Sequence, residues 1–231
     1  MEVFPIDNLN SPASKHPLND EQHQTPPSNE GKLNPLLSVW LHPNQTAQYV
    51  MKHKGIGYCI MLIIIGYIAV FLSSIAGTDL YPTFTVGIIT IFVVVLGPII
   101  GLISSTIYTG VIFLVGKLFN GQGSYKNLFK VLTLPTIPYL ALAPFYAIWL
   151  AVSPESMFIA DFSGAMVLLS MLSGFLTFIV SVWSIVISIA VIAQAHKFSN
   201  WKAFFTILIP MLILFLVLVV FFVLVISIIT L

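Results

Sequence analysis

Long apolar stretches separated by short polar gaps fill most of the chain, from about residue 55 to its end. A helix of about 20 apolar residues is enough to cross the hydrocarbon core of a bilayer. The pattern therefore predicts an all-α membrane protein with a five-helix transmembrane domain over residues 55–231. The spans are expected at about residues 56–76, 84–115, 131–152, 164–195 and 201–231.

The N-terminal part of the chain has a different composition. Residues 1–32 are acidic and rich in Pro, Asn, Ser and Gln, so we expect a disordered cytosolic tail. A docking arm for a cytosolic partner is the alternative. Residues 33–54 place Leu37, Trp40 and Leu41 on one helical face. This pattern indicates an amphipathic segment in the membrane interface, or a docking face for another subunit.

Charged residues of the hydrophobic region alternate between successive gaps. Lysines precede the first span and lie in the gaps after the second and fourth spans, whereas acids lie in the gaps after the first and third. Positively charged loops stay in the cytoplasm. We therefore expect the N-terminus inside and the C-terminus outside.

Few residues offer catalytic or ligand chemistry. Only 7% of residues are charged, arginine is absent, and the lone Cys59 has no partner for a disulfide. No predicted span holds an ionisable side chain in its central region, where such groups usually serve a function. We therefore expect no catalytic residue, metal or cofactor. The lack of a basic patch interleaved with aromatic residues argues against a nucleic-acid partner.

Small residues predict where helices pack closely in the bilayer. Gly66 and Ser73 share one face of the first span, and Gly97 and Gly101 form a GxxxG surface around Pro98 in the second. A hinge or a broken helix at Pro98, lining a path, is the alternative.

The fourth span carries a seam of small and hydroxyl side chains. Helical spacing places these residues on one face, which predicts tight packing with hydroxyl hydrogen bonds, or alternatively the wall of a hydrated pathway. The seam residues are Ser170, Gly174, Thr177, Ser181, Ser184 and Ser188.

The basic gaps predict a cytosolic contact surface. A turn signal at residues 120–124 precedes helical spacing at Tyr125, Leu128 and Leu132, so we expect a second interfacial helix there. The candidate contact residues are Lys117, Lys126, Lys130, His196, Lys197, Trp201 and Lys202.

Three segments resemble bacterial Yip-domain proteins: residues 40–46, 116–125 and 195–203. Together with the five spans and the Gly-Pro step, they make residues 35–228 similar to the Yip family, whose name comes from interaction with Ypt/Rab GTPases. Val95 and Leu96 stand where eukaryotic members carry an Asp, so the resemblance gives no support for binding of Rab-type GTPases.

The resemblance implies a non-catalytic accessory or scaffold protein of the bacterial inner membrane. Such a protein works through other integral membrane proteins, and some bacterial members accompany ABC-type exporters. It therefore implies an exporter that removes toxic peptides as a partner, besides the lipid bilayer; self-association is a further alternative. A small passive transporter or channel is the competing hypothesis, indicated by the hydroxyl seam and by Pro98 and Pro144.

Overall fold

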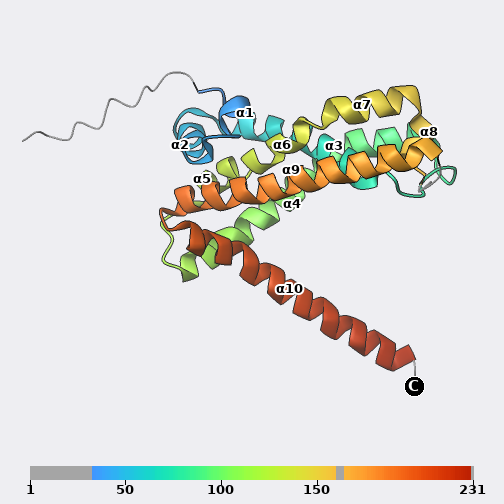
Figure 1. Cartoon of the computed structure of the whole chain (residues 1–231). Coiled ribbons are helices and arrows are strands. Elements are labelled where there is room, and N and C mark those ends of the chain that lie inside the picture. The colour runs from blue at the N-terminus through green and yellow to red at the C-terminus, as the bar shows by residue number, and fades with distance from the viewer. Residues whose placement is uncertain (1–32, 160–163, 230–231) are drawn as a thin grey trace, which may run out of the picture. The chain divides into compact units, whose positions relative to one another are not determined.

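The computed structural model describes residues 33–159 and 164–229, and this part of the chain folds into helices without a strand (Figure 1). The predicted tail at residues 1–32 and Asp161 lie outside the described residues. The four long helices are α3 (Ile56–Ile75), α4 (Val86–Leu118), α9 (Gly164–His196) and α10 (Asn200–Ile229). The short ones are α1 (Pro35–Ser38), α2 (Pro43–His53), α5 (Tyr125–Val131), η1 (Leu134–Thr136), α6 (Ile137–Leu140), α7 (Ala143–Val152) and α8 (Pro154–Met157).

Each of the four long helices has the length and composition to cross a membrane. The expected third span is instead a bent pair, residues 125–140 and 143–152, with an angle of 45° between its parts. Prolines explain the break, since Pro135, Pro138 and Pro144 remove backbone donors in turn. The structure confirms an all-α membrane protein, with four spans or, if the bent pair is one span, five.

The GxxxG surface of α4 packs against α3 of the same chain. A Cβ atom added at Gly101 would collide with the ring of Tyr67, and one at Gly97 would lie 3.5 Å from the Tyr67 carbonyl oxygen. α4 is helical through Pro98 from end to end, so the broken-helix alternative is wrong. In lipid, close backbone approach of this kind supplies the van der Waals contact that holds helices together.

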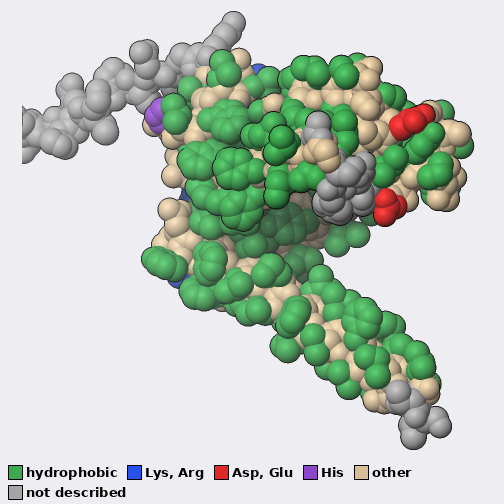
Figure 2. Space-filling view, turned by 45° about the vertical axis from the view of Figure 1, so that its right-hand side comes forward, with side chains coloured by type: hydrophobic (Ala, Val, Ile, Leu, Met, Phe, Trp, Pro, Cys, Tyr) green, Lys and Arg blue, Asp and Glu red, His purple; other side chains and the backbone are tan. Residues whose placement is uncertain are grey.

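The two ends of the bundle carry opposite charges. We call the side formed by α2, α5 and the α4–α5 and α9–α10 links the basic end, and the side formed by α8 and the α3–α4 link the acidic end. Figure 2 shows the acidic side chains gathered at one end of the visible face and histidine at the other. Asp79 and Glu155 lie on the α3–α4 link and α8. This separation matches the charge alternation along the chain.

The short helices of the basic end pack into the protein. α1 directly precedes α2, and the Asn34 side chain caps it by accepting a hydrogen bond from the Leu36 amide. Leu37 in α1 and Leu41 after it are exposed. α5 contacts α2, α4 and α9, and its Leu128 is fully buried. The apolar face of α5 therefore packs into the core of the bundle, and the place of this helix at the bilayer surface stays a prediction.

α10 contacts the other helices only near its start. Ala203 and Thr206 are buried against neighbouring elements, which include α9 and α4. Its most apolar stretch has no buried residue, and side chains from Met211 to Ile229 are largely exposed. α10 therefore depends on surroundings outside the described bundle to cover its apolar surface.

We expect the substitution Gly101→Ala to destabilise the protein by about 1–3 kcal/mol, because its methyl group would overpack the Tyr67 ring. Gly87→Ala on the same helix is the matched control, since a Cβ there meets nothing within 4 Å. Thermal unfolding in dodecyl maltoside, followed by tryptophan fluorescence, measures both. Equal melting temperatures for the two variants would contradict the described α3–α4 contact.

Candidate functional site

The link between α9 and α10 is built around His196. α9 ends at His196, and Lys197 follows with a φ of 56°, in the left-handed region. The Phe198 amide then donates a hydrogen bond to the Ala193 carbonyl, 3.1 Å away. A left-handed residue at this position is a common way for a helix to end. The turn places the His196 ring beside the α4–α5 link.

Three glycines surround the His196 ring. A Cβ atom at Gly116, Gly121 or Gly123 would collide with the imidazole or approach it within contact distance. The Gly123 amide donates to Nδ1 at 3.3 Å, and the Phe198 ring stacks on the imidazole with centroids 5.0 Å apart. His196 is fully buried as a result. We call His196, Phe198 and the three glycines the histidine cluster.

Burial changes the role of two predicted contact residues. His196 cannot form part of an exposed contact surface, and Lys130 is 8% exposed because its Nζ donates to the Met51 carbonyl at 3.0 Å. The prediction of cytosolic contact is therefore wrong for both. The sequence feature that indicates burial of His196 is the pair of glycines in the turn at residues 121–123, because glycines leave room for its ring.

The other predicted contact residues are exposed. Lys117 also donates to the Gly121 carbonyl at 3.1 Å, so the end of its side chain is held at the histidine cluster. Trp201 is 73% exposed at the start of α10. The exposed residues of the basic end are Lys117, Lys126, Lys197, Trp201 and Lys202.

The hydroxyl seam of α9 meets the bent segment of α6 and α7. The Tyr146 hydroxyl shares hydrogen bonds with Ser173, at 3.0 Å, and Thr177, at 2.9 Å. The Tyr139 hydroxyl shares one with Ser181 at 3.0 Å. Sequence reasoning located the seam, but it identified neither tyrosine as a partner and left out Ser173, which is buried.

Further along α9, the seam contacts backbone. Ser184 donates to the Pro135 carbonyl at 2.7 Å, whereas Ser188 donates within α9 to the Ser184 carbonyl at 2.8 Å. On α3, Gly66 lies against Thr136 of η1. The small residues of α3 and α9 thus pack against the segment where the prolines interrupt the helix.

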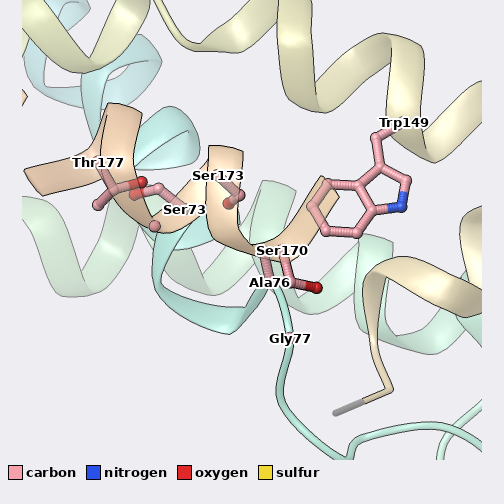
Figure 3. A pocket seen from close by; sticks show the side chains of 8 residues that line it. Ser73, Ala76, Gly77, Trp149, Ser170, Ser173 and Thr177 are labelled. Atoms are coloured by element: carbon pink, nitrogen blue, oxygen red, sulfur yellow. The ribbon is translucent and has the colours of Figure 1, made fainter. Parts of the chain in front are cut away.

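Two small pockets lie along the seam. Figure 3 shows the first, of about 170 Å³, where Ser170, Ser173 and Thr177 of α9 lie near Ser73 and Trp149. Gly174 also lines it, and a Cβ there would meet nothing within 4 Å, so this glycine makes no close helix contact.

The second pocket, of about 240 Å³, touches α9 at Ser184 and Ser188. The Ser181–Tyr139 hydrogen bond lies between the two pockets along the helix. The Tyr139 side chain therefore occupies the seam between them. Within the described residues, no group of three His, Cys, Asp or Glu side chains could hold a metal ion.

The apolar helices and the packed hydroxyl seam define an integral membrane protein that crosses the bilayer several times. A model of the Yip1 domain matches residues 37–222. The chain therefore belongs to the Yip1 family, a family of multi-span membrane proteins. No curated protein and no solved structure matches the chain.

We expect Gly116→Ala to destabilise the protein by about 1–3 kcal/mol, because its methyl group would collide with the buried His196 ring. Gly110→Ala, two turns earlier on α4, meets nothing within 4 Å and should leave stability unchanged or raise it slightly. Thermal unfolding in detergent compares the two. A variant with Gly116→Ala that melts like the wild type would show that the histidine cluster is not closely packed.

Proposed function

We propose that the protein is a non-catalytic accessory or scaffold protein that binds other integral membrane proteins. The observation that carries the proposal is the exposed surface of α10. Its most apolar stretch has no buried residue, although the helix is long enough to cross a bilayer. Such a helix can pack against a helix of another protein without disturbing the rest of the fold.

The small-residue faces, in contrast, serve the fold of the chain itself. Gly97 and Gly101 face Tyr67, Gly66 faces Thr136, and the α9 seam faces the two tyrosines. Faces of this kind can also bind the helices of partner proteins. Because neighbours within the chain already cover them, we assign partner binding to α10 and to the exposed residues of the basic end.

A narrower form of the proposal concerns the partner and its location. The resemblance to bacterial Yip-domain proteins supports the bacterial inner membrane and an ABC-type exporter that removes toxic peptides. The lysines Lys126 and Lys202 would then face the cytoplasm, as the rule for positive loops requires. This narrower form rests on the resemblance alone.

Site-specific photocrosslinking in intact cells tests the role of α10. A photoreactive amino acid at Leu216 of α10 should give crosslinks to specific integral membrane proteins, identified by mass spectrometry. Leu168 of α9 is the matched control, since both leucines are exposed, at 61% and 71%. Val191, which is fully buried, controls for background.

The proposal fails if Leu216 yields only lipid adducts, or the same protein adducts as Leu168. Adducts with an ATPase or permease of an exporter would support the narrower form. Adducts only between copies of this chain would indicate self-association in place of a scaffold role.

A passive transporter or channel is the second candidate, and the two pockets along the hydroxyl seam favour it. The scaffold proposal predicts no flux of glycerol or potassium ions into liposomes that contain the purified protein, because Tyr139 and Tyr146 occupy the seam. Flux above that of empty liposomes, increased by Tyr139→Ala, would favour the channel instead.

A further inference from the structure

A pocket of about 440 Å³ opens at the basic end, where α2, the α4–α5 link, α5 and the end of α9 meet. Its volume lies within the range of small-molecule sites. Amide and ammonium side chains contribute to its lining through Gln48, Lys52, Gln122, Asn127, Gln194 and Lys197, beside Met51, Ser124 and Ala195.

The charged residues that the structure describes in this pocket are lysines. Lys52 and Lys197 both line it, and no carboxylate of the described residues does. The two described acids, Asp79 and Glu155, lie at the acidic end. The Lys197 ammonium therefore attracts an anion to the pocket, and no carboxylate among the described lining residues repels it.

Lys197 has a backbone conformation that favours glycine. Its φ of 56° lies in the left-handed region, where a side chain costs free energy, and glycine is the usual residue after a helix. The chain nevertheless carries a lysine there, and that side chain lines the pocket. The residue that ends α9 in this conformation therefore also adds a positive charge to the pocket.

The donors of the pocket suit a phosphate group. A carboxylate offers two oxygens. A phosphate monoester offers three non-bridging oxygens around one centre, and a phosphodiester offers two together with two weaker ester acceptors. Lysines serve as point charges for phosphate, and the amides of Gln48, Gln122 and Gln194 can donate to further oxygens. The pocket also has room for a polar group attached to the phosphate.

We propose that this pocket binds the phosphate group of a small polar phosphate ester, supplied either by the headgroup of an anionic phospholipid or by a soluble compound. The site lies at the end of the bundle where Leu37, Leu41 and Trp201 expose apolar side chains, as expected at a bilayer surface. The lipid is therefore the expected source. This inference does not depend on the proposed scaffold function.

The test uses the full chain in dodecyl maltoside, with phosphatidylglycerol as the probe and phosphatidylcholine as the neutral comparison. Native mass spectrometry measures the dissociation constant of each lipid. Lys197→Gly should weaken phosphatidylglycerol binding about fivefold, as expected for one lysine near anionic lipid. The same variant should melt at or above the temperature of the wild type, because glycine relieves the left-handed strain.

Lys126→Gln is the matched control, since it removes one positive charge from the basic end at an exposed residue that does not line the pocket. It should change the dissociation constant less than twofold. Gln122→Leu provides a second test that alters neither the net charge nor the Lys197 turn, and it should also weaken binding. Equal losses for Lys126→Gln and Lys197→Gly would overturn the site and leave only general surface attraction.

Competition with glycerol 1-phosphate separates the two sources. Displacement of phosphatidylglycerol at millimolar glycerol 1-phosphate, lost in Lys197→Gly, would support the site and identify a soluble ester as its ligand. Binding of phosphatidylglycerol without displacement would support the lipid. If neither probe binds more tightly than phosphatidylcholine, the proposal is wrong.

Discussion

Unpaired backbone carbonyls constrain this structure more than any other feature, because hydrocarbon offers no water to satisfy them. The constraint is most severe between α5 and α7, where Pro135, Pro138 and Pro144 interrupt the helix. Side-chain hydroxyls supply part of the missing hydrogen bonds. Thr133 donates to the Lys130 carbonyl at 2.8 Å and Ser184 to the Pro135 carbonyl at 2.7 Å. One of these hydrogen bonds comes from within the bent segment, and the other comes from the neighbouring helix α9.

The need for hydrogen bonds to the interrupted backbone explains why α9 supports the rest of the bundle. Its seam binds the bent segment through Tyr139 and Tyr146, and its C-terminal end carries His196 into the basic end. The same helix therefore contacts elements at both ends of the bundle. Hydroxyl hydrogen bonds between transmembrane helices contribute only about 0.6–2 kcal/mol each, so the seam works as a series rather than through one bond.

Features that repeat along a helix could be predicted from the sequence. The GxxxG spacing and the hydroxyl steps locate packing faces, because helical geometry alone places such residues together. The partners of those faces could not be predicted, since they depend on tertiary arrangement. Tyr139 and Tyr146 have the amphipathic rings typical of membrane boundaries, yet hydroxyls 27 to 42 residues away bind them inside the bundle. Burial of His196 likewise depends on glycines more than 70 residues earlier.

The division between α10 and the other helices follows from the same constraint. From α3 to α9, interrupted backbone and hydroxyl groups bind one another, so these elements cannot separate without losing hydrogen bonds. α10 has a continuous helical backbone. Beyond Thr206 its apolar side chains make few contacts with the bundle, so movement of this helix would break few of them. The histidine cluster fixes the turn from which α10 starts, because Lys197 and Phe198 are held beside His196. A partner helix could therefore pack on α10 while the bundle keeps every internal hydrogen bond, which is the physical basis for assigning association to this helix.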